Sequence, residues 1–149
     1  MFKLEAEKDL LESFRPKDRP LVEIPQDMKL PMFVRNYLSW AHPAGGRAFL
    51  VFVVPGGVPT GIVFETNGSP PITPGICDWC RTVGSGNPVG LLSARVNAKK
   101  VAGVHVCADL GCQQRLEEES NRTGRSVLPA MEKLLERIGK FANEGLGID

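Results

Sequence analysis

The stretch that decides the fold begins with Cys77-Asp78-Trp79-Cys80, continues for 26 residues, and ends with Cys107-Ala108-Asp109-Leu110-Gly111-Cys112. Two residues between the first two thiols is a spacing at which a tight turn lets both sulfurs reach one zinc ion, at about 2.3 Å. Four residues between the second two suit the end of a strand followed by the first turn of a helix. We therefore predict one structural zinc ion per chain. The predicted ligands are Cys77, Cys80, Cys107 and Cys112.

Other uses of clustered thiols are disulfide bonds and redox chemistry. In a secreted chain four cysteines can form two disulfides, and a Cys-x-x-Cys pair can be a redox pair. The first 14 residues mix charged and apolar residues without the apolar region of a signal peptide, and the longest apolar run, 48–54, is too short to span a bilayer. We therefore expect a soluble cytoplasmic protein, in which thiols stay reduced and are available to a metal.

The residues between and after the two cysteine pairs predict a hairpin and a helix. Strands over 88–96 and 101–106 flank a short turn, and a helix is expected over 109–119. With Asp109 as the N-cap of this helix, Cys112 falls in its first turn. The helix N-terminus then offers unpaired N–H groups and a positive dipole end to the thiolates. A cysteine turn, a hairpin and a helix in this order make a treble-clef zinc finger.

The N-terminal part is predicted to combine helices with an extended segment. Residues 3–14 and 32–40 carry apolar side chains at helical spacing, and the proline-rich segment 15–31 between them is expected to be extended. The second helix is expected to pack an aromatic face into the core. This face consists of Phe33, Tyr37 and Trp40.

Two further strands and a long helix complete the predicted α+β fold of small antiparallel hairpins plus helices. Segments 47–54 and 58–65 predict an antiparallel hairpin, whose first strand is apolar on both faces and should be covered on both. The final helix is expected over 126–145, with Ser126 as its N-cap. The expected parts are a lead-in over 1–70 packed on the finger, the finger over 71–124, and a C-terminal amphipathic helix over 125–149.

The charge balance argues against a general nucleic-acid-binding protein. The chain has 18 Lys and Arg against 17 Asp and Glu, which gives a net charge of +1. Between Cys77 and Cys112 four cations face two carboxylates, and a zinc ion with four thiolates adds net negative charge, so the finger is near neutral. Nucleic-acid-binding domains usually carry a clear excess of positive charge. We expect the exposed cations to contact an acidic protein partner. The candidate contacts are Arg95, Lys99 and Lys100.

Catalysis is not expected. A catalytic zinc keeps one position open for water, whereas four cysteines close the coordination shell. Of the two histidines, His105 lies two residues before Cys107 and is expected to hydrogen-bond near the site or to be an ordinary strand-face residue. His42 is expected to be solvated in a turn. The sequence shows no catalytic triad, phosphate-binding loop or carboxylate pair, so we predict no catalytic residue, no small-molecule substrate and no membrane partner.

These motifs resemble a known family. The Cys-Asp-x-Cys turn, then Gly90-Leu91-Leu92, and then the run from Val104 through Cys107 to Cys112 are similar to the C-terminal treble-clef domain of bacterial elongation-factor-G-binding proteins of the fusidic-acid-resistance type. The similarity covers roughly residues 30–120. It implies that the four cysteines bind zinc, that elongation factor G is the partner, with the ribosome as a further candidate, and that the protein acts on translation. The alternative is a treble clef that binds ribosomal RNA or another nucleic acid.

Overall fold

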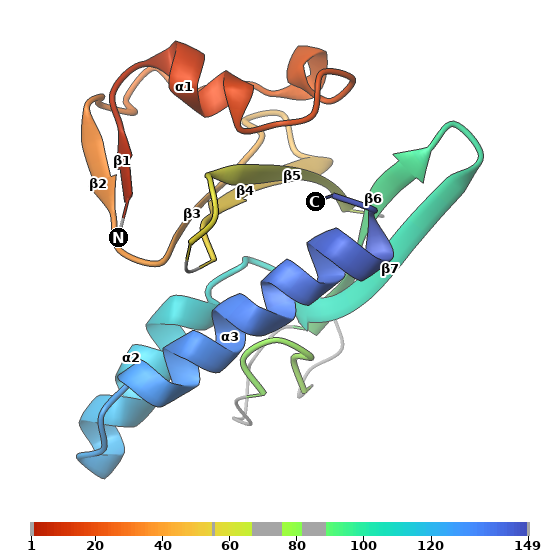
Figure 1. Cartoon of the computed structure of the whole chain (residues 1–149). Helices are drawn as coiled ribbons and strands as arrows, with labels where there is room; N and C mark the ends of the chain where they lie inside the picture. The colour runs from red at the N-terminus through yellow and green to blue at the C-terminus, as the bar shows by residue number, and fades with distance from the viewer. Residues whose placement is uncertain (1, 55, 67–75, 82–88, 149) are drawn as a thin grey trace. The chain divides into compact units, whose positions relative to one another are not determined.

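A computed structural model describes residues 2–54, 56–66, 76–81 and 89–148. The chain divides into two compact units, Met1–Glu65 and Thr66–Asp149. Both units combine antiparallel strands with helices, so the predicted α+β class is confirmed (Figure 1). The division falls at residue 65, the expected boundary at residue 70 lies outside the described residues, and 125–149 belongs to the same unit as the cysteines.

The first unit begins with a short strand where a helix was expected. Strand β1 (Phe2–Leu4) pairs antiparallel with β2 (Met32–Val34), and α1 (Glu7–Glu12) follows. The helix predicted over 3–14 is therefore shorter, because residues 3 and 4 form strand hydrogen bonds with β2 and do not join the helix. A single 3-10 turn at Arg19–Leu21 is the regular element of the proline-rich segment.

The helix predicted over 32–40 is wrong. The chain forms β2 there and then β3 (Tyr37–Ala41), which pairs with the next strand from Tyr37↔Phe52 to Ala41↔Ala48. Tyr37 is buried, but Phe33 is 67% exposed, so these side chains share no common face. Aromatic residues favour strands, and pairing with β1 and with the following strand outweighs the accidental helical spacing.

The hairpin predicted next is confirmed. Strands β4 (Arg47–Phe52) and β5 (Thr60–Thr66) pair antiparallel, from Arg47↔Glu65 to Phe52↔Thr60. Every residue of β4 after the first is buried, so both of its faces are covered as expected. On β5, a side chain at Gly61 would meet the ring of Phe14 at 2.7 Å, which explains why this strand carries a glycine there.

The second unit contains the predicted second hairpin. Strands β6 (Val89–Asn97) and β7 (Lys100–Cys107) pair antiparallel from Val89↔Cys107 outward, with a register shift between Arg95 and Asn97. The alternation of apolar residues in both segments is the local signal that made this hairpin predictable. Its open end delivers Cys107 to the first pair of cysteines.

Two helices follow the hairpin. Helix α2 (Cys112–Thr123) ends at Gly124, which adopts a φ of +71° as a left-handed C-cap. Helix α3 (Leu128–Lys140) continues into a π-helical turn at Phe141–Gly145. The predicted last helix is thus present, although its N-cap is Val127, and the Ser126 Oγ accepts a hydrogen bond from the Leu128 N–H at 3.3 Å.

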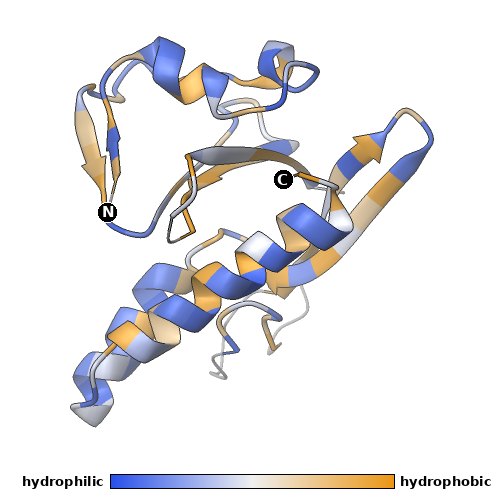
Figure 2. Ribbon diagram, viewed as in Figure 1, coloured by the Kyte–Doolittle hydropathy of each residue, from blue (hydrophilic) through white to orange (hydrophobic). Residues whose placement is uncertain are grey.

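The amphipathic pattern of α3 is that of a packing face. Met131, Leu134 and Ile138 are buried, while Leu128 in its first turn is 68% exposed. Figure 2 shows polar and apolar residues alternating along this helix. Among the described residues, no helix has the length and apolar character that crossing a bilayer requires.

Candidate metal centre

The fold brings the four cysteines of the motif together. Their ligand atoms all lie within 4.8 Å of one another, and all four side chains are buried. The Sγ atoms of Cys77 and Cys112 are 3.6 Å apart, as are those of Cys80 and Cys107. Disulfide sulfurs lie about 2.05 Å apart, whereas sulfurs bound to one tetrahedral zinc ion are about 3.8 Å apart. The thiols are free, and their spacing fits a shared metal ion.

The first pair of cysteines lies on a tight turn, here called the knuckle (residues 77–81). The turn closes through a hydrogen bond from the Arg81 N–H to the Cys77 carbonyl at 2.9 Å, and Arg81 adopts a φ of +55°. The Asp78 N–H donates to the His105 carbonyl at 2.9 Å, which fixes the knuckle to β7. These contacts place Cys77 and Cys80 beside the end of β7.

Backbone N–H groups converge on the sulfur of Cys77. Trp79 and Cys80 donate to it at 3.4 Å, and Cys107 donates at 3.3 Å. Hydrogen bonds from the Cys107 and Cys112 thiols, with the backbone N–H of Cys80, lower the pKa of Cys77 below that of an ordinary thiol. The same donors favour negative charge on this sulfur.

The Cys112 thiol, in contrast, is harder to ionise than an ordinary thiol. Hydrogen bonds to the Cys107, Cys77 and Cys80 sulfurs, together with burial, raise the pKa of Cys112. Four thiolates in one buried cluster repel one another unless a cation compensates them. A closed set of four sulfur donors is also the set that structural zinc prefers. The residues present therefore fit a zinc ion.

The second pair of cysteines is positioned by a turn that the sequence did not reveal. Helix α2 begins at Cys112 with Gly111 as its N-cap, so the prediction of Asp109 as N-cap is wrong. Instead, the Asp109 Oδ1 accepts the Gly111 N–H at 2.9 Å, and Leu110 adopts a φ of +55°. This left-handed residue reverses the chain direction, so the helix begins later in the sequence than predicted. Cys112 nevertheless lies at the helix N-terminus.

Arg115 is a residue beside the thiol cluster that the sequence reasoning missed. Its guanidinium binds both carboxylate oxygens of Asp109, at 2.8 and 3.0 Å, and lies next to Cys107. This contact lowers the pKa of Asp109. The signal was its position on α2 three residues after Cys112, which places both residues on one face of the helix. Arg115 brings a cation to the thiolates and ties the turn to α2.

The two histidines lie apart from the thiol cluster. The His105 side chain is exposed, and it is the backbone carbonyl of this residue that supports the knuckle. The Nδ1 of His42 accepts the Ala44 N–H at 3.0 Å within its turn. Neither imidazole is among the ligand atoms that the described residues bring together.

The candidate partner contacts also lie away from the cluster. Arg95, Lys99 and Lys100 are exposed on the β6–β7 hairpin, two of them at its closed end. Figure 1 shows this end of the hairpin projecting beyond α3.

Comparisons with known proteins agree with this geometry. The family model described as FBP C-terminal treble-clef zinc-finger matches residues 10–144. Among solved structures, the chain is similar to the fusidic acid resistance protein FusC, with a TM-score of 0.55 and 17% sequence identity over 83% of this chain. At that identity the likeness shows the fold alone, and the match spans 56% of the FusC chain. The comparison with curated proteins found no match.

Proposed function

This chain belongs to the FBP C-terminal treble-clef zinc-finger family, as its cysteine motifs predicted, and from that premise we propose that it is a zinc-stabilised module that binds elongation factor G and acts on translation. The observation that carries the proposal is the buried cluster of four thiols inside a domain of this family. FusC is a resistance protein by name; our proposal for this chain is limited to binding the factor.

One structural zinc ion per chain is the proposed cofactor, held by Cys77, Cys80, Cys107 and Cys112. When bound, the ion neutralises thiolate charge and joins the knuckle, the end of β7 and the start of α2. Four cysteines leave no ligand position for a reacting water, which supports a binding module rather than an enzyme. A reducing compartment such as the cytoplasm fits four free thiols.

The β6–β7 hairpin is the proposed contact surface for the factor. Residues 89–107 contain Arg95, Lys99 and Lys100 and no Asp or Glu, so this hairpin is locally positive although the chain as a whole is near neutral. A positive surface of this kind favours an acidic patch on a partner, and it acts mainly on the rate of association and on its salt dependence.

Reversing the charge of the hairpin tip should slow binding. We expect Lys99→Glu with Lys100→Glu to reduce the rate of association with elongation factor G about tenfold at low salt, and less at high salt, because steering is lost. Zinc content and folding should not change, since both side chains are exposed. Surface plasmon resonance at several salt concentrations measures the rate.

The matched control is Lys8→Glu with Lys29→Glu, which makes the same change in net charge at exposed positions of the first unit. An equal slowing in this variant would show that net charge, and not the hairpin, governs association.

Calorimetry that detects no heat at tens of micromolar between the zinc-loaded protein and the factor would contradict the proposed partner. Tight, strongly salt-dependent binding of ribosomal RNA under those conditions would support the nucleic-acid alternative.

A further inference from the structure

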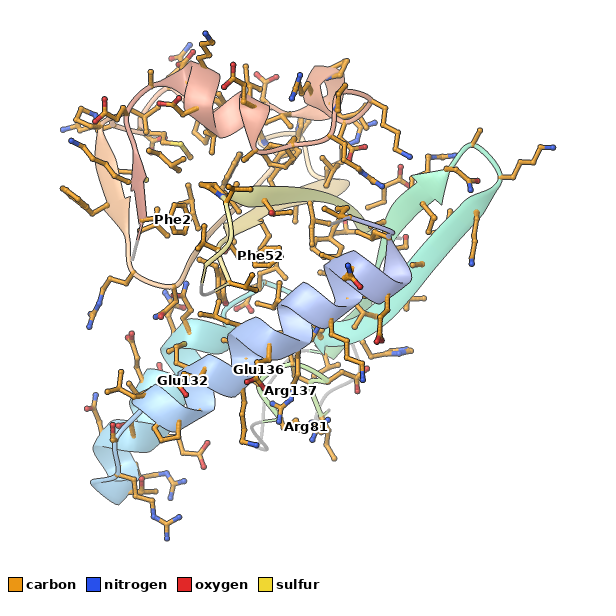
Figure 3. All side chains as sticks on the ribbon, in the orientation of Figure 1. Phe2, Phe52, Arg81, Glu132, Glu136 and Arg137 are labelled. Carbon is orange, nitrogen blue, oxygen red and sulfur yellow. The ribbon has the colours of Figure 1, made fainter. Side chains whose placement is uncertain are left out.

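Helix α3 reaches the knuckle across 58 residues of sequence. The Arg137 Nη1 donates a hydrogen bond to the Trp79 carbonyl at 2.6 Å. One turn further along, the Phe141 ring meets the Trp79 indole edge-on, with ring centroids 6.0 Å apart. Trp79 is only 3% exposed, and its hydrogen bond with the half-buried Arg137 is partly buried. Figure 3 shows the Arg137 side chain leaving α3 on the side of the knuckle.

The peptide that Arg137 contacts is the one that joins Trp79 to Cys80. Its carbonyl oxygen accepts from Arg137, and its N–H, which belongs to Cys80, donates to the Cys77 sulfur at 3.4 Å. In a trans peptide the C=O and N–H groups point in opposite directions. The guanidinium and the sulfur therefore hold the same peptide plane from its two ends.

A charged donor on the carbonyl strengthens the opposite hydrogen bond. Hydrogen bonds in series polarise one another, and a bond from a guanidinium is about twice as strong as a neutral one. The Cys80 N–H is thus a better donor to the Cys77 sulfur when Arg137 is in place. The same plane also fixes the direction in which the Cys80 side chain leaves the turn.

We propose that Arg137 is a positioning residue of the metal centre, which makes zinc retention by the knuckle depend on α3. This inference rests on the proposal that the four thiols hold zinc. The sequence led us to expect the C-terminal helix to be a separate part. With this role for Arg137, α3 instead contributes to the metal centre of the treble clef. Arg137 touches no ligand atom directly and acts through the Trp79–Cys80 peptide.

The test is the rate of zinc release from the full-length protein into an excess of a colorimetric chelator. Arg137→Ala should release zinc about tenfold faster or more, in line with the loss of a hydrogen bond to a charged group. Arg137→Lys, which keeps the charge and one donor, should lie between Arg137→Ala and the wild type. It also provides a folded variant if alanine at this position does not fold.

The matched control is Ile138→Val, which removes one methylene from a fully buried side chain of the same helix and leaves the Arg137 side chain in place. It should lower the melting temperature and leave the release rate within about twofold of the wild type. The cobalt-substituted protein gives a second readout. Its thiolate-to-metal absorption should shift in Arg137→Ala and not in Ile138→Val.

Two results would overturn the inference. One is a release rate in Arg137→Ala equal to that of the wild type or of Ile138→Val. The other is a cobalt spectrum that Arg137→Ala leaves unchanged. A wild-type protein that binds no zinc would instead overturn the metal centre itself, together with this role of Arg137, so the two failures are distinguishable.

Discussion

Replacing Cys107 with serine should unfold the zinc finger while the β4–β5 hairpin stays folded. Binding of structural zinc contributes on the order of 10 kcal/mol to the folding of small fingers, and a serine hydroxyl does not replace a thiolate ligand. Cys107 ends β7 and its backbone carbonyl accepts the Leu110 N–H of the turn into α2, so the loss of its sulfur from the metal centre loosens the point where the hairpin meets that turn. Strands β4 and β5 belong to the other compact unit.

Amide hydrogen exchange measures this difference between the units. We expect protection to be lost in β6, β7 and α2 and retained in β4 and β5. The wild-type protein after removal of zinc by a chelator should give the same pattern, which separates metal loss from an effect of serine itself. Protection across 101–116 that is the same in Cys107→Ser and in the wild type would contradict the prediction.

Removing zinc should also abolish binding to elongation factor G. The proposed contact surface is a hairpin whose second strand ends at Cys107. Without the metal, this end of the hairpin is no longer held to the other cysteines. When the binding-competent state is rarely populated, apparent affinity falls by the same fraction, and we expect a loss of at least about 100-fold. Calorimetry with chelated protein, before and after zinc is added back, measures it.

Specificity for the metal is the control for this experiment. Adding zinc should restore binding, whereas magnesium, which prefers oxygen ligands, should not. Tight binding of the factor by zinc-free protein would show that the contact surface lies outside the finger or does not need the metal.

The elements that the sequence predicted well are those with local signals. The two cysteine pairs need only a tight turn and a strand-to-helix junction, and both hairpins carry apolar residues bounded by turn residues. Each of these signals lies within about a dozen residues of chain, where propensity and spacing act directly.

The errors come from tertiary contacts that residue spacing does not reveal or from rare backbone conformations. Residues 32–40 become strands because β1 and β4 pair with them, and aromatic spacing alone does not reveal those partners. The start of α2 moves to Cys112 because Leu110 adopts a left-handed conformation that a leucine seldom takes. Arg137 could not be assigned to the metal centre, since it reaches Trp79 only after α3 has packed on the finger.

Elemental analysis of protein purified without chelator, combined with its mass measured under native conditions, tests the central claim most directly. The four thiols within 4.8 Å of one another predict one zinc ion per chain and no loss of mass from disulfide formation. A fully folded protein that contains no metal would contradict the account.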